Sequence, residues 1–211
     1  MRALSVGDCL SFAWETFKRR PWILIGGFLL AMIISGIPNM FGTPPEVTPD
    51  GQIVPRIPSA SDIVVFIVSA IVAVLVWTGL ITFFLRAHDN VEGVQLADLW
   101  NPAPFWRFLG AHILTGIVVG LGFIAFIVPG VILALGLAFV PYLVVERGLG
   151  PVDAMKESWR VTKGYKGQIG LLILALVGIV ILGLLALGIG VFVAAPIAML
   201  AMTHAYRLLA T

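Results

Sequence analysis

The side chains that could support chemistry in this chain are few and widely separated. His88, His112 and His204 lie far apart, and neither an HExxH motif nor a cysteine and histidine cluster at metal-ligand spacing accompanies them. The sequence also lacks the GxxxxGK[ST] pattern of a phosphate-binding loop. We therefore expect no metal and no cofactor, and an enzyme would need a hydrophilic cavity around Glu146, His88 or Glu157.

The elements that must position these side chains are strongly apolar. Of the 211 residues, 60% are hydrophobic and 11% are charged, and the mean hydropathy is +1.06. A soluble domain has about 45–50% apolar and about 25% charged residues. The net charge of +2 does not favour nucleic acid as a partner. Cys9 is the only cysteine, so it cannot form an internal disulfide, and we expect it to be a small apolar residue on a helix face.

Six apolar segments are expected to cross a membrane as helices, because a hydrocarbon core of about 30 Å needs about 20 helical residues, and the fourth of them is short. The interior of each segment lacks Asp, Glu, Lys and Arg, which argues against a proton relay or a carboxylate metal site. We predict an all-α polytopic membrane protein with residues 1–211 in one integral membrane domain. The expected spans are 22–40, 63–85, 105–128, 131–145, 169–187 and 191–208, with an irregular external loop at 41–61.

Proline and glycine set the expected turns and kinks. Pro129 and Gly130 predict a tight reversal that makes the third and fourth spans an antiparallel hairpin, and the 188–190 cluster predicts another between the last two spans. Pro141 predicts a kink or early end in the fourth span, and Pro196 predicts a kink in the sixth. We therefore expect three helical hairpins.

A GxxxG step in the third span favours close helix contact. Gly116 and Gly120 supply it, and small residues at this spacing let two helices approach closely. We expect packing within the chain, with dimerisation as the alternative.

Two amphipathic segments, 5–19 and 151–163, each precede an apolar span. A helix with one apolar and one charged face in this position is typical of the membrane interface, and both are expected on the cytoplasmic side. For 5–19 the alternative is a helix that packs on protein. Its expected apolar stripe is Val6, Leu10, Ala13, Trp14 and Phe17.

A degenerate repeat relates these two segments. Aligning them pairs Trp14 with Trp159 and Lys18 with Lys163. With the shorter segment 94–100, this pattern suggests three units, each an interfacial helix followed by a transmembrane hairpin.

The distribution of cations predicts the orientation. With six spans and the N-terminus inside, 12 of the 13 Lys and Arg residues lie in the cytoplasm and only Arg56 lies outside. The 12 are Arg2, Lys18, Arg19, Arg20, Arg86, Arg107, Arg147, Lys156, Arg160, Lys163, Lys166 and Arg207. Five of the six tryptophans fall on the same side. We predict a multi-pass protein of the cytoplasmic (inner) membrane with both termini in the cytoplasm.

These cations and tryptophans form a candidate rim for lipid or partner binding. Its members are Trp14, Lys18, Arg19, Arg20, Trp22, Trp159, Arg160, Lys163 and Lys166. Each Lys or Arg near an anionic leaflet contributes about 1 kcal/mol of attraction. Contact with phospholipid headgroups or a partner protein is the functional interpretation, and topology determination with anchoring is the alternative.

A second set of residues carries a resemblance to known proteins. The set is Pro129, Gly130, Pro141, Glu146, Ala154, Ser158, Trp159, Thr162 and Gly164. At these positions the sequence resembles bacterial and archaeal six-span membrane proteins similar to the membrane domain found ahead of some glycerophosphoryl diester phosphodiesterases. The catalytic barrel is absent here, so the resemblance implies no hydrolase activity and no catalytic residues. It implies an inner-membrane protein tied to envelope lipid metabolism or transport.

The expected function is therefore a non-enzymatic membrane module that binds phospholipid, a membrane protein partner or a second copy of itself. The alternative is a small permease or lipid transporter that uses the kinked fourth and sixth spans, because broken helices often surround a transport path. An enzyme ranks third.

Overall fold

The computed structural model describes residues 4–42, 59–186 and 188–210, and these form helices and connecting turns with no strand among them. Six helical segments in this part of the chain are long and apolar enough to cross a membrane. They are Pro21–Phe41, Ala60–Asp89, Phe105–Ala125, Ile127–Arg147, Lys166–Leu185 and Val191–Ala210. The chain is therefore an all-α, multi-pass membrane protein, as predicted. Most of the expected loop 41–61, together with Arg2 and Arg56, lies outside the described residues.

The chain begins with α1 (Val6–Arg19), where the Ser5 hydroxyl accepts a hydrogen bond from the backbone N–H of Asp8. The face of α1 formed by Cys9, Ala13 and Phe17 is buried, and α1 packs mainly on α9. Trp14, expected in the apolar stripe, is instead 48% exposed. The apolar face of α1 is thus covered by protein, as in the alternative of a packing helix.

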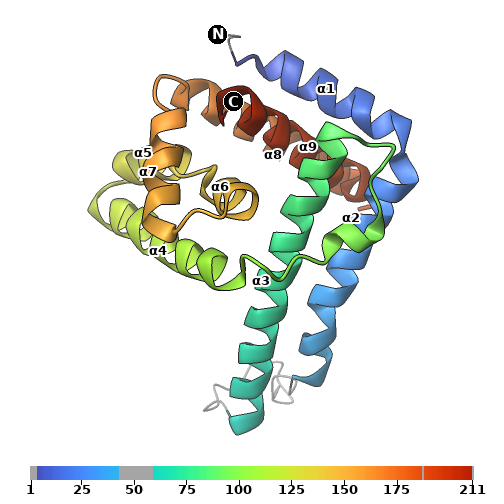
Figure 1. The fold of residues 1–211 in the computed structure, drawn as a ribbon, viewed down its shortest axis with the longest axis vertical. Coiled ribbons are helices and arrows are strands. Elements are labelled where there is room, and N and C mark those ends of the chain that lie inside the picture. Colours follow the sequence, from blue (N-terminus) through green and yellow to red (C-terminus); the bar gives the residue numbers. More distant parts are fainter. Residues whose placement is uncertain (1–3, 43–58, 187, 211) are drawn as a thin grey trace, which may run out of the picture.

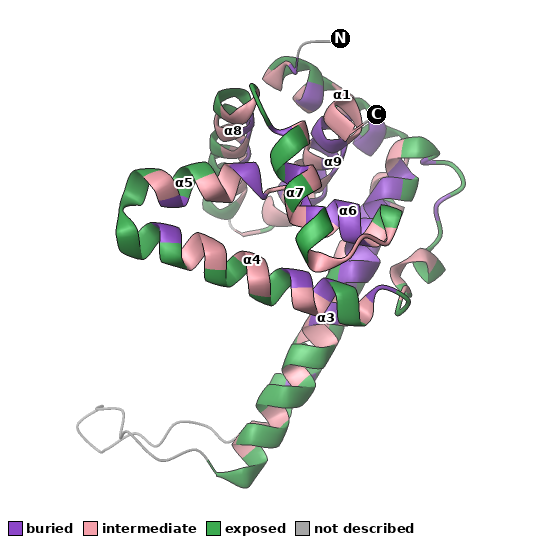
Figure 2. Cartoon of the chain, turned by 60° about the vertical axis from the view of Figure 1, so that its left-hand side comes forward, coloured by how far each residue is buried: buried purple, intermediate pink, exposed green. Residues whose placement is uncertain are grey.

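The α2 and α3 helices form an arm that projects from the body of the molecule (Figure 1). α2 (Pro21–Gly36) continues into the 3-10 helix η1 (Ile37–Phe41), and α3 (Ala60–Asp89) begins at a capping box between Ser59 and Asp62. α3 has 30 residues and extends beyond the expected 63–85 at both ends. Its first half is largely exposed and its second half is buried in the body (Figure 2).

The α4–α5 hairpin turns earlier than expected. α4 (Phe105–Ala125) and α5 (Ile127–Gly136) are separated by Phe126 in an extended conformation, so the reversal does not lie at Pro129 and Gly130. Pro129 lies in the first turn of α5, where a missing N–H is tolerated. Gly130 packs against α4, since a Cβ on Gly122 would lie 3.0 Å from the Gly130 Cα. The glycine serves the close approach of two helices, and the antiparallel hairpin itself is as predicted.

The fourth span is broken between α5 and α6 (Val140–Arg147). Pro141 lies in the first turn of α6, and its ring is incompatible with a helical carbonyl four residues earlier, at Leu137. The kink predicted from Pro141 is therefore confirmed. α9 (Val191–Ala210), in contrast, continues through Pro196 as one helix.

The remaining elements connect these spans. The segment 94–100 forms the 3-10 helix η2 (Leu96–Leu99), so it does not repeat the amphipathic α-helices. α7 (Pro151–Val161) packs on α4 and α6. α8 (Lys166–Leu185) reverses into α9 at the predicted 188–190 turn, where Gly188 has a φ of 74°.

α9 lies at the centre of the molecule and contacts α1, α2, α3 and α8. The α4–α5 hairpin crosses α3 steeply, and it does not run parallel to the α2–α3 arm (Figures 1 and 2). The body thus combines helices of different direction around α9.

Candidate functional site

The predicted rim falls into two groups, one on α1 and the start of α2 and the other on α7 and the turn into α8. In the first group Trp14 and Trp22 are 48% and 84% exposed, and the Lys18 ammonium lies 5.8 Å from the Trp14 ring centroid. Arg20 has a structural role, because its guanidinium donates to the carbonyl of Glu92 at 2.6 Å. Arg20 therefore fixes the α1–α2 junction to the segment that follows α3.

The second rim group is built on the indole of Trp159. The Lys166 ammonium lies 3.0 Å from its ring centroid. The indole is also so close to α5 that a Cβ on Gly136 would lie 2.3 Å from a ring atom. Trp159 remains 40% exposed. Gly164, with a φ of 88°, permits the tight turn between α7 and α8.

The cations of the rim differ in their partners. Arg160 donates to Glu157 at 2.6 and 2.8 Å, and this hydrogen bond holds the pKa of the Glu157 carboxyl below its ordinary value. Lys18, Arg19 and Lys163 are exposed and have no carboxylate partner among the described residues. These three cations are therefore available to a ligand, whereas Arg20 and Arg160 are engaged.

Two hydroxyl groups of the resemblance motif bind the break in the fourth span. Ser158 is fully buried, and its Oγ donates to the Gly136 carbonyl at 2.9 Å and accepts from the Phe139 N–H at 3.3 Å. Thr162, also buried, places its Oγ1 3.2 Å from the same carbonyl and 2.8 Å from the Ser158 carbonyl. α7 thereby satisfies backbone groups that the break releases from helical hydrogen bonds.

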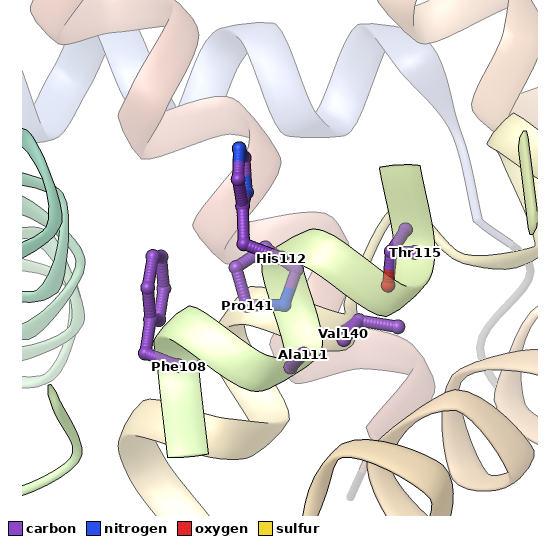
Figure 3. Close-up of a pocket in the computed structure, with 6 residues that line it drawn as sticks. All are labelled: Phe108, Ala111, His112, Thr115, Val140 and Pro141. Atoms are coloured by element: carbon purple, nitrogen blue, oxygen red, sulfur yellow. The ribbon is translucent and has the colours of Figure 1, made fainter. Parts of the chain in front are cut away.

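A small cavity lies between α4 and the start of α6, and Figure 3 shows its lining. Its volume is about 40 Å³, which is room for water and not for a substrate. Thr115 Oγ1 is buried there and has no hydrogen-bond partner among the described residues. His112 lies in the same lining, and its ring stacks on Phe108 with centroids 6.2 Å apart.

The structure brings His88 and His204 together, although they are 116 positions apart. His88 Nε2 lies 3.0 Å from His204 Nδ1, and His88 Nδ1 lies 3.1 Å from an oxygen of Asp89. The Phe12 ring of α1 stacks on His204 with centroids 4.1 Å apart and an interplanar angle of 12°. Sequence reasoning missed this pair, and the one available signal was that both histidines lie near span ends expected on the same side.

An ion-pair network adjoins the histidine pair. Arg207 pairs with Asp89 at 2.5 Å and also with Glu146, which accepts a hydrogen bond from the Tyr206 hydroxyl. Arg107 donates to the carbonyl of Gly148 at 2.6 Å. The network joins span ends that the sequence analysis places on one side of the membrane, so the contacts agree with that arrangement.

None of this forms a recognisable reaction centre. Within the described residues no group of three or more His, Cys, Asp or Glu side chains could hold a metal ion. Glu146 and Glu157 are both engaged in ion pairs. The described polar contacts hold helices together, and exposed cations and tryptophans lie at the rim.

The chain is similar to proteins of mycobacteria. An uncharacterized protein of Mycobacterium bovis and one of Mycobacterium tuberculosis strain CDC 1551 are each 25% identical to it. Each alignment is 225 residues long and covers 96% of this chain and 68% of the relative. An uncharacterized protein of the H37Rv strain is 24% identical over the same length. No family model matches the chain, and no solved structure matches it.

Proposed function

We propose that this chain is a non-enzymatic protein of the cytoplasmic membrane whose rim binds phospholipid headgroups on the cytoplasmic side. The observation that carries the proposal is that an exposed tryptophan, Trp14, lies beside Lys18, an exposed cation without a carboxylate partner among the described residues. A second exposed tryptophan, Trp159, has the half-buried Lys166 ammonium over its ring and is followed four positions later by the exposed Lys163.

The two residue types act at the same depth of a bilayer. Indole rings favour the membrane interface, since they are apolar with one polar N–H, and each nearby cation adds about 1 kcal/mol of attraction to an anionic leaflet. The excess of 12 cations over one supports the cytoplasmic leaflet as the side of binding. The resemblance to a membrane domain found with phosphodiesterases of lipid-derived substrates supports a place in envelope lipid processes.

The rim side chains, and not the apolar faces of the amphipathic helices, are the proposed contact. The buried face of α1 is covered by α9, and Ala154 and Ser158 on α7 are buried against the body. Insertion of either helix into lipid would require its release from protein. Side chains that are already exposed need no such release.

The fourth span is broken as the transporter alternative expects, but the backbone groups at the break are already occupied. A broken helix marks a transport path when its free backbone groups can meet a substrate or ion. Here Ser158 and Thr162 occupy those of Gly136 and Phe139, and α9 is unbroken at Pro196. We therefore retain headgroup binding as the proposed function.

A lipid-retention experiment tests the proposal. The protein is reconstituted in mixed phosphatidylcholine and phosphatidylglycerol nanodiscs, extracted, and analysed for retained lipid by native mass spectrometry. We expect preferential retention of phosphatidylglycerol, and a fall of up to about fivefold in that preference for each of Lys18→Gln, Arg19→Gln and Lys163→Gln, since about 1 kcal/mol corresponds to that factor.

Arg160→Gln is the matched control, because it removes the same charge three positions away from Lys163 but from a residue already paired with Glu157. Its effect should be the smaller of the two. Equal retention of both lipids by the wild type would overturn the proposal. So would an unchanged preference in a variant that combines Lys18→Gln, Arg19→Gln and Lys163→Gln. Retention of a protein in place of lipid would favour the partner alternative.

A further inference from the structure

The His88–His204 pair is a contact point of three helices. His88 belongs to α3 and His204 to α9, and Phe12 of α1 stacks on His204 and lies 4.6 Å from His88 between centroids. A polar cavity of about 330 Å³ lies beside the pair, and Phe12, Arg19 and His88 are among the residues that line it. A cavity of this size and polarity holds water, so protons can reach the pair from the side of α1.

Charged groups face the pair from every element packed around it. They are Asp8, Glu15 and Arg19 on α1, Asp89 on α3, Glu92 in the segment after α3, Glu146 on α6 and Arg207 on α9. Burial of the rings is the largest influence and opposes charge on the pair, whereas Asp89, 3.1 Å from His88 Nδ1, and Asp8 favour it. Arg207 and the other imidazolium oppose a second charge.

The hydrogen bond between the rings limits the protons that the pair can hold. A contact of 3.0 Å between Nε2 and Nδ1 requires one nitrogen to donate and the other to accept. The contact therefore survives with neither ring charged or with one ring charged. When both rings are imidazolium, two N–H groups face each other and the contact breaks.

We propose that the His88–His204 pair is a proton-sensitive latch that holds α1 against α3 and α9 and releases it when both histidines are protonated. The inference is independent of headgroup binding at the rim. The docked state excludes the second proton, so acidification shifts the equilibrium toward the released state by up to about tenfold per pH unit. Release moves the Phe12 ring off His204 and uncovers the buried face of α1.

Cys9 provides a native reporter of this motion. It is the only cysteine of the chain, it lies on the same face of α1 as Phe12, and its side chain is fully buried. Burial raises the pKa of its thiol to about 11, so the docked thiol is also chemically inert. Labelling of Cys9 therefore requires that α1 leave the body.

The experiment measures the rate of Cys9 modification by 4,4′-dithiodipyridine between pH 7.5 and pH 5.0. Each rate is divided by that of the denatured protein at the same pH, which removes the pH dependence of the reagent and thiol. We expect the normalised rate of the wild type to rise at least about tenfold as the pH falls below about 6.5, the ordinary pKa of an imidazole, which the histidines regain in the released state.

Two variants remove titration while keeping contacts. His204→Phe keeps an aromatic ring against Phe12, and His88→Gln keeps an amide that can donate to His204 Nδ1. Both should label slowly at pH 7.5 and show no rise at pH 5.0. His112→Gln is the matched control, because His112 lies on α4 with its ring against Phe108, and its rise should equal that of the wild type.

A flat profile in the wild type would overturn the latch. So would a rise of wild-type size in both His88→Gln and His204→Phe. If one of these variants labels rapidly at pH 7.5 because it folds poorly, the other decides the question. Circular dichroism at both pH values checks that the helices themselves persist.

Discussion

At the scale of single residues, the Ser158 hydroxyl replaces hydrogen bonds that a continuous helix would make between α5 and α6. It accepts from the N–H of Phe139 and donates to the carbonyl of Gly136, so one side chain serves both ends of the break. Such groups would be unsatisfied in an apolar environment without it. The residue belongs to the architecture of the fourth span and not to a ligand site.

Replacement of Ser158 by alanine should therefore destabilise the protein. We expect a loss of about 1–3 kcal/mol in the free energy of unfolding, because the Phe139 N–H loses its partner in a buried position. Unfolding of the detergent-solubilised protein, followed by circular dichroism, measures the loss. Ser11→Ala, at an exposed position of α1, is the matched control and should be neutral. Equal stability of the two variants would refute the structural role.

Sequence reasoning identified Ser158, Pro141 and Gly164 as a motif but could not see what the motif does. The kink at Pro141 is a local effect and was predicted, but the role of Ser158 depends on α7 folding back onto the break between α5 and α6, which no local pattern encodes. The His88–His204 contact was missed for a related reason, since 116 residues separate the two rings and only the packing of α3 on α9 joins them.

At the scale of elements, close approach to η2 constrains α3. A Cβ on Gly79 would lie 1.8 Å from the carbonyl oxygen of Leu99, which is backbone and cannot rotate away. The hydroxyl of Thr78 also donates to the carbonyl of Asn101 at 3.1 Å. The segment between α3 and α4 therefore packs directly against the α3 backbone at Gly79.

Gly79→Ala should disrupt this packing of Gly79 against the Leu99 backbone. We expect a destabilisation of about 1–3 kcal/mol or more, because the added methyl group must push the two backbones apart. Gly178→Ala on α8 makes the same change where no atom lies within 4 Å, and it should be neutral or stabilising because alanine favours helices. Thermal unfolding of both variants in detergent gives the comparison. A Gly79→Ala protein as stable as Gly178→Ala would show that the Gly79–Leu99 contact is not close enough to exclude a methyl group.

Helices were more predictable than the turns between them. Hydropathy and length located all six spans, since only long apolar helices satisfy their backbones in lipid. The α4–α5 reversal was predicted too late in the sequence. The pair Pro129 and Gly130 is compatible both with a turn and with the first turn of a packed helix, and here it belongs to the helix. A Cβ on Gly116 or Gly120 would meet no atom of another element within 4 Å in the described chain, so the expected close packing within the chain was wrong there and dimerisation stays a prediction.

At the scale of the whole molecule, the contacts of Arg207, Glu146 and Asp89 join the ends of α9, α6 and α3. All three are ends of even-numbered spans, which an N-terminus in the cytoplasm places on one side. The number of spans predicts this grouping, and the positive-inside rule predicts that the shared side faces the cytoplasm.

Introduced cysteines can determine the compartment. Cys9 itself is buried and cannot report which side of the membrane it lies on, so the cysteines are introduced into a Cys9→Ala background. Lys156→Cys, at an exposed position of α7, should resist a membrane-impermeant maleimide in intact cells and react after permeabilisation. Arg56→Cys, in the loop expected outside, should react in intact cells. Reversed reactivity of the two would invert the topology and move the proposed lipid contact to the other leaflet.

The steep crossing of α4 over α3 has a consequence for the surrounding lipid. α4 has 21 residues and is about 31 Å long, close to the hydrocarbon thickness of about 30 Å that an upright helix must match. Two helices that cross steeply cannot both stand along the bilayer normal. When α3 stands along the normal, α4 is strongly inclined and reaches across only part of that thickness, and we expect acyl chains beside the α4–α5 hairpin to shorten or splay into a locally thinned annulus.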